Sequence, residues 1–122
     1  MKKFVLPGLA FMGFCAVACG AFGAHALKSH LDASQLEIWK TASLYLLTHT
    51  LAGLWVGYQF PKSWSALFFL GGCLLFSGSL YALVLTQIKI LGAITPVGGI
   101  LFLTGWLSLF INVTKNSLKN EK

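Results

Sequence analysis

The stretch at residues 20–28 reads GAFGAHALK, and it separates an apolar N-terminal segment from the part of the chain that holds Asp32 and Glu37. The apolar run before it, residues 4–26, is long enough to cross a bilayer, which takes about 20 residues in a helix. A basic start and small residues around position 25 also resemble a signal peptide, but the run exceeds the roughly 7–15 residues of a signal-peptide core. We therefore predict a retained transmembrane helix that ends in this stretch.

The composition of the whole chain extends this interpretation to a class of protein. Of its 122 residues, 57% are hydrophobic and 10% are charged, whereas soluble domains carry roughly 25% charged residues. Further apolar stretches follow the first and leave no room for a soluble domain. We predict a single domain over residues 1–122, an all-α integral membrane protein with four transmembrane helices in a compact antiparallel bundle, at residues 4–26, 33–60, 64–86 and 91–114.

The charges indicate how the chain lies in the membrane. All nine basic residues are lysines, giving a net charge of +6, and they lie between or outside the apolar segments. This arrangement is typical of topology signals and lipid headgroup contacts rather than of nucleic-acid binding. Three lysines fall on one side, Lys28, Lys40 and Lys89, and six on the other, Lys2, Lys3, Lys62, Lys115, Lys119 and Lys122. The positive-inside rule then predicts a multi-pass protein of the bacterial inner membrane with both termini in the cytoplasm.

The second helix is predicted to begin before its apolar run. Asp32 is a suitable N-cap, and Gln35 stands at the capping-box position. A helix over residues 33–60 would measure about 42 Å, which exceeds the hydrocarbon thickness. We therefore expect its first two turns to extend into the interface, with Trp39 marking the headgroup level.

The fourth helix has an unusual start, since residues 92–99 read GAITPVGG. Thr95 as N-cap with Pro96 in the first turn would begin a helix there, leaving non-helical chain before it at membrane depth. The alternative is a helix from Ile90 with a kink at Pro96. We favour a bent or broken start, so the prediction is a fourth helix kinked or broken near Pro96.

Small residues recur at helical spacing along all four segments. Such residues let a second helix approach closely in lipid, where van der Waals packing replaces the hydrophobic drive. The predicted helix-packing positions are Ala16, Gly20, Ala24, Gly53, Gly57, Gly71, Gly78, Gly98 and Gly105.

A stripe of polar residues along the second helix gives the candidate binding site. Tyr45 and His49 continue into Gly53 and Gly57 at a spacing of four, so this face should lie against protein. His25 is predicted near the outer edge of the hydrocarbon, and the facing helices supply hydroxyl partners. The hypothetical site therefore comprises His25, Tyr45, His49, Ser77, Ser79 and Thr95.

We predict no metal site and no cofactor. On straight helices His25 and His49 differ in depth by roughly 12 Å, which argues against a haem or metal ion held by both. Cys15, Cys19 and Cys73 all lie in apolar segments, where an odd count does not form a disulfide framework. Buried cysteines of this kind mostly behave as small apolar residues.

Four blocks of sequence carry a resemblance to a known family. They are GAFGAH at residues 20–25, TASLYLLTH at 41–49, FSGSLY at 76–81, and GAITPVGG at 92–99 with GW at 105–106. In this order they resemble the YgdD/YwdK-like family of small bacterial inner-membrane proteins, catalogued as domain of unknown function 423. The resemblance implies a four-helix inner-membrane protein, and it transfers no catalytic or binding residue.

The sequence excludes several function classes. No Asp, Glu or Arg lies in an apolar segment, whereas proton-coupled exporters usually need a buried carboxylate. Ser77 and Ser79 lack a His–Asp constellation, so we expect no enzymatic activity. The favoured hypothesis is a structural or accessory bundle that associates with itself or with a larger membrane complex and contacts lipid. The alternative is a module that binds or conducts a lipid, quinone or small solute near His25 and His49.

Overall fold

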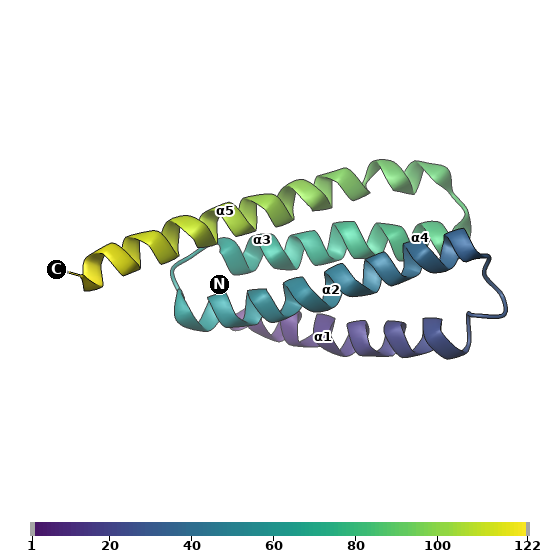
Figure 1. The fold of residues 1–122 in the computed structure, drawn as a ribbon, viewed down its shortest axis with the longest axis horizontal. Helices are drawn as coiled ribbons and strands as arrows, with labels where there is room; N and C mark the ends of the chain where they lie inside the picture. Colours follow the sequence, from purple (N-terminus) through teal and green to yellow (C-terminus); the bar gives the residue numbers. More distant parts are fainter. Residues whose placement is uncertain (1, 122) are drawn as a thin grey trace.

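Residues 2–121 are described by a computed structural model, and every regular element in that range is helical (Figure 1). Met1 and Lys122, the latter counted above for orientation, lie outside the described residues. The all-α prediction is confirmed. The elements are α1 (Lys2–His25), α2 (Ala33–Gln59), α3 (Ser65–Gly72), the π-helix η1 (Cys73–Ser77), α4 (Gly78–Thr86), the 3-10 helix η2 (Lys89–Ala93) and α5 (Thr95–Asn120).

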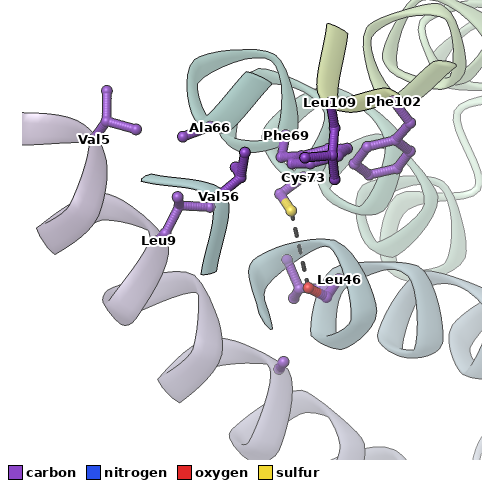
Figure 2. Close-up of a cluster of buried hydrophobic side chains, with 10 residues drawn as sticks. Val5, Leu9, Leu46, Val56, Ala66, Phe69, Cys73, Phe102 and Leu109 are labelled. Atoms are coloured by element: carbon purple, nitrogen blue, oxygen red, sulfur yellow. Dashed lines mark hydrogen bonds between the residues drawn. The ribbon is translucent and has the colours of Figure 1, made fainter. Parts of the chain in front are cut away.

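The helices run alongside one another, and α3, η1 and α4 follow each other as one continuous rod (Figure 1). Helix α2 packs against α1 on one side and against the α3–η1–α4 rod on the other, while α5 packs against α3 and η1. Both ends of the described chain lie at the same end of the molecule (Figure 1). Buried side chains from all four helical stretches form one core, which includes Leu9, Leu46, Phe69 and Phe102 (Figure 2).

Three of these stretches are long and apolar enough to cross a membrane: Lys3–His25, Ser65–Thr86 and Lys89–Asn120. Helix α2 has 27 residues and is less apolar than the others. Its sequence includes serine, threonine, glutamine, glutamate, lysine and histidine. On length and apolarity alone, three of the four predicted spans are therefore recovered.

The start of α2 follows the sequence prediction. The Asp32 carboxylate accepts a hydrogen bond from the Gln35 backbone N–H at 2.8 Å, and the Gln35 side chain accepts one from the Asp32 N–H at 3.0 Å. Trp39 is buried within the protein, since this side chain is only 4% exposed; its position at the headgroup level stays a prediction. Its indole N–H donates to the Cys19 carbonyl at 2.8 Å. Gly23 leaves room for it, since a Cβ there would overlap the indole ring.

The π-helix η1 was not predicted from the sequence. A π-turn holds one residue more than an α-turn and therefore widens the helix locally. Here the Ser77 hydroxyl is buried and donates to the Ala42 carbonyl of α2 at 2.8 Å. On the α5 side, Gly98 lies against the backbone of Phe76. Both neighbouring helices thus meet the third stretch at its widened turn.

Helix α5 begins differently from the prediction. The 3-10 helix η2 precedes it, and Ile94, with φ −79° and ψ −32°, is the N-cap without a side-chain capping bond. Thr95 is therefore not the cap. Its hydroxyl lies 2.6 Å from the Ser79 hydroxyl and bonds to that group instead of capping its own helix. The change from 3-10 helix to α-helix falls at Ile94, and Pro96 occupies the first turn of α5, where proline is tolerated. The helix continues to Asn120, beyond the predicted end at residue 114, and begins four residues after the predicted start at residue 91. The bounds predicted for the other three helices lie within two residues of the observed ones.

The predicted small-residue positions differ in how closely a neighbouring helix approaches them. A Cβ added at Gly53, Gly57, Gly98 or Gly105 would lie within 3 Å of another helix, and Ala16 is buried. Gly71 is somewhat less crowded, with Leu101 3.2 Å from such a Cβ. Gly20 and Gly78 have no atom within 4 Å of the added Cβ, and Ala24 is exposed. These last three positions leave small surfaces that the described chain does not cover.

Candidate functional site

A groove of about 730 Å³ lies between α2 and α5. Phe76 of η1 contributes to it, so three elements form its walls. Apart from Tyr45, Thr48, His49 and the indole N–H of Trp106, its side chains are apolar. The lining residues are Leu44, Tyr45, Thr48, His49, Phe76, Pro96, Gly99, Ile100, Phe102, Leu103 and Trp106.

His49 is the best-fixed polar side chain of this groove, with 8% of its surface exposed. Its Nδ1 lies 2.8 Å from the Tyr45 carbonyl oxygen, and its Nε2 lies 3.0 Å from the Trp106 indole nitrogen. A carbonyl only accepts and an indole N–H only donates. Nδ1 therefore carries the hydrogen, Nε2 accepts, and the imidazole is neutral. Both ring nitrogens are thus engaged within the chain.

Aromatic rings hold this arrangement in place. The His49 ring stacks on Phe102 at 3.7 Å between centroids, and Phe69 meets the Trp106 ring edge-on at 5.2 Å. Tyr45, one turn before His49 on the same face, stacks on Phe76 at 4.6 Å. Offset-stacked and edge-to-face pairs are favourable ring geometries. The wall of the groove is therefore closely packed and largely aromatic.

Tyr45 supplies the polar group that remains available to a ligand. It is 39% exposed, and its hydroxyl makes no hydrogen bond with residues 2–121. The neighbouring Thr48 hydroxyl already donates to the Leu44 carbonyl at 2.8 Å. The groove consequently has a mostly apolar lining with one O–H group that is available to a ligand.

The structure brings together only part of the predicted site. Tyr45 and His49 line the groove, whereas His25 is exposed at the end of α1 and does not line it. Ser77, Ser79 and Thr95 hold the walls from outside: Ser77 bonds to α2, and the Ser79–Thr95 pair ties α4 to the start of α5. The site is thus a seam between α2 and α5 rather than a junction with α1.

Trp106 and Phe102 are important in the groove but do not belong to the site predicted from the sequence. Trp106 stands in one of the blocks that carry the family resemblance, and nothing in the sequence around it distinguishes it from Trp55 or Trp64 as a partner of His49. Its role depends on the register between α2 and α5, which places residue 106 beside residue 49. A sequence periodicity gives the face of each helix but not this register.

The described residues contain no group of three or more His, Cys, Asp or Glu side chains that could hold a metal ion. A metal at His49 would have to take the Nε2 lone pair from the Trp106 indole. His25 does not line the groove, so this histidine pair is not arranged as a shared ligand set.

Replacing Trp106 by phenylalanine should lower the free energy of unfolding by about 1–2 kcal/mol, because it leaves the buried His49 Nε2 without a donor. The check is unfolding of the purified protein by SDS in mixed micelles. Trp64→Phe is the control, since Trp64 is 59% exposed and has no groove contact. Equal stability of the two variants would contradict the role given to the Trp106–His49 bond.

Comparison with known proteins gives a consistent result. The family model described as "Protein of unknown function (DUF423)" matches residues 19–99. A UPF0382 membrane protein of Staphylococcus aureus strain bovine RF122 is 43% identical over 120 residues, covering 94% of this chain and 98% of its own. A UPF0382 membrane protein of Staphylococcus saprophyticus is 44% identical over 120 residues, and the match covers 94% of this chain and 99% of that protein. No solved structure matches the chain.

Proposed function

We propose that this chain, which belongs to the DUF423 family of small membrane proteins of unknown function, crosses a bacterial inner membrane four times and binds a lipid-soluble molecule between α2 and α5. The proposed ligand has an apolar body and a hydrogen-bond acceptor at one end. The activity is binding rather than catalysis.

Two features of α2 support a fourth crossing. Its 27 residues span about 40 Å, and it lies alongside the other helices over most of their length (Figure 1). Its lower apolarity has a structural reason, because polar side chains inside the membrane face protein. Thr50 is buried against Cys73, and the Ser43 hydroxyl lies 2.7 Å from that of Tyr81.

The orientation rests on the lysine distribution. Both ends of the described chain and the turn between α2 and α3, which holds Lys62, lie at one end of the molecule (Figure 1). Lys28 belongs to the turn between α1 and α2, Lys40 to the first turns of α2, and Lys89 to η2, all toward the other end. The end with more lysines faces the cytoplasm under the positive-inside rule. We place the N- and C-termini there, in a bacterial inner membrane.

The groove is the observation that supports ligand binding. Its volume of about 730 Å³ falls in the range of small-molecule sites, which are mostly apolar with a few placed polar groups. The free Tyr45 hydroxyl is such a group, and the bonded His49–Trp106 pair keeps the wall in one conformation. Because both nitrogens of His49 are occupied, the imidazole contributes shape and stacking rather than metal ligation.

The binding test uses purified protein in lipid nanodiscs with a short-chain quinone as the probe. Its apolar tail and carbonyl acceptors match the groove, and binding is read from quenching of tryptophan fluorescence and from bound mass in native mass spectrometry. Leu103→Trp should abolish binding, because Leu103 is exposed in the groove and an indole there would fill it. Tyr45→Phe removes one hydrogen bond and should weaken binding roughly tenfold.

Leu107→Trp is the matched control, since Leu107 is also exposed on α5 but lies outside the groove. It should bind the probe as the native chain does. The proposal fails if the native protein binds no probe, or if Leu103→Trp and Leu107→Trp bind equally well.

A second candidate, a structural or accessory protein, has its own supporting observation. Gly20 and Ala24 line a hollow of about 170 Å³ beside Trp39, at the outer ends of α1 and α2, and no atom lies within 4 Å of a Cβ at Gly20. Small surfaces of this kind fit a helix of a second copy or of a larger complex.

Self-association is tested by the oligomeric mass in nanodiscs. Gly20→Leu with Ala24→Leu should convert oligomers to monomers, whereas Ala18→Leu, exposed on the opposite face of α1, should not. A native chain that is monomeric at every protein-to-lipid ratio would rule this candidate out.

A further inference from the structure

A second hollow, of about 350 Å³, separates the C-terminal ends of α2 and α5. It shares no residue with the groove that contains His49. One part of its lining is aromatic, from Trp55 and Phe60. The other part is polar and consists of Gln59, Asn116, Ser117 and Asn120.

The polar part is built by helical spacing. Asn116 and Asn120 lie one turn apart on α5, with Ser117 beside them, and Gln59 faces them from the last residue of α2. Each amide presents two N–H donors. These four side chains make no hydrogen bonds with the described part of the chain, and no carboxylate lines the hollow. All four side chains are exposed, so their N–H and O–H groups are available to a ligand, and no carboxylate in the lining competes for them.

The charge at this end of the molecule is positive. Among the residues whose side chains the structure describes, four lysines belong to the segments at this end: Lys3 at the start of α1, Lys62 in the turn after α2, and Lys115 and Lys119 near the end of α5. The carboxylate of Glu121 is the single acidic side chain described in these segments. Asp32 caps α2 and Glu37 lies in its first turns, and this start of α2 is at the opposite end of the molecule (Figure 1). The lysines at this end therefore attract an approaching anion, and the amide N–H groups in the hollow can donate hydrogen bonds to it.

The position of the hollow matches the headgroup layer. Helix α5 has 26 residues, about 39 Å, so its last turns extend beyond a hydrocarbon core of about 30 Å. In Figure 1 this part of α5 projects past the other helices. Trp55 and Trp64, both exposed near this end, are of the type that accumulates at membrane interfaces.

We infer that this hollow binds the phosphate headgroup of an anionic phospholipid in the cytoplasmic leaflet. The amides of Gln59, Asn116 and Asn120 and the Ser117 hydroxyl donate to the phosphate and glycerol oxygens. The acyl chains then run along Trp55 toward the hydrocarbon. The surrounding lysines raise the local concentration of anionic lipid, and the amides distinguish this site from a general basic surface.

The experiment is native mass spectrometry of the full-length protein with an equimolar mixture of dioleoyl phosphatidylglycerol and dioleoyl phosphatidylcholine. The native chain should retain phosphatidylglycerol preferentially. Asn116→Leu with Asn120→Leu removes amide donors without changing charge and should reduce that preference about tenfold. Gln59→Leu, on the other helix, should reduce it independently even if the α5 variant proves unstable.

Lys119→Gln is the control for general electrostatic attraction, and it should reduce the preference only about twofold, because a screened surface charge is worth little. Glycerol 1-phosphate is added in a separate arm, and it should not displace the bound lipid. The inference is overturned if the two lipids are retained equally, if the amide variants behave like Lys119→Gln, or if the soluble phosphate displaces the lipid.

Discussion

Replacing Gly98 by alanine should lower the free energy of unfolding by about 3 kcal/mol, the upper end of the usual cost of overpacking. A Cβ at this position would overlap the backbone nitrogen of Phe76 and lie 2.7 Å from its Cα. Backbone atoms in the π-helix η1 cannot move aside as a flexible side chain would. Helix α5 must therefore shift away from η1, which also separates the α5 wall of the His49 groove from its other walls.

The neighbouring glycine provides the control for this prediction. A Cβ at Gly99 would meet only Phe76 Cδ2 at 4.0 Å, so Gly99→Ala should be neutral or more stable by up to about 1 kcal/mol, the helix-propensity gain. Both variants are compared with the native chain by SDS unfolding in mixed micelles. If Gly98→Ala unfolds at the same SDS fraction as Gly99→Ala, the close contact of α5 with η1 is not present in the protein.

Phe69→Ala should cost about 2.5 kcal/mol, chiefly from the cavity that it leaves. Phe69 is fully buried, and its ring lies within 3 Å of a Cβ placed at Gly105. In Figure 2 it lies in one cluster with Phe102 and Leu109. The transfer term that adds to this cost in water is largely absent, because the unfolded helices remain in lipid. The lost ring also supported Trp106, so binding of the quinone probe should weaken.

Phe110→Ala serves as the comparison, since Phe110 is 67% exposed and loses only contacts with lipid. Its stability should stay within about 0.5 kcal/mol of the native value. The same SDS titration measures both. Comparable losses for the two phenylalanines would mean that Phe69 is not the centre of the core.

The sequence predicts well those features that depend on local chemistry. The Asp32–Gln35 cap is local in this sense, and so is the face of α2 that turns His49 and Gly53 inward. Trp39 shows the limit of such reasoning, because an aromatic residue near charged neighbours is typical of an interface. It is buried only because Gly23 of another helix leaves it space, and that contact depends on how α1 and α2 are aligned.

The groove could be predicted only in part for the same reason. Tyr45 and His49 were identified from their spacing on one helix, but Trp106 becomes a partner of His49 only through the register of α5. The start of α5 was also misplaced, because Thr95 was expected to cap its own helix. Its hydroxyl bonds instead to Ser79, and a short-range rule cannot anticipate a partner on another helix.

The extra residue in η1 changes the angular phase of the third membrane stretch. An α-helix advances about 100° per residue, so a helical wheel drawn continuously from Ser65 to Thr86 misplaces every side chain after the π-turn by about that angle. The first half, with Phe69, and the second half, with Tyr81, must be plotted on separate wheels. On a single wheel Tyr81 falls about 120° away from Phe69, whereas the shift at the π-turn brings it close to the angle of Phe69, and it contacts Ser43 and Trp39 of α2.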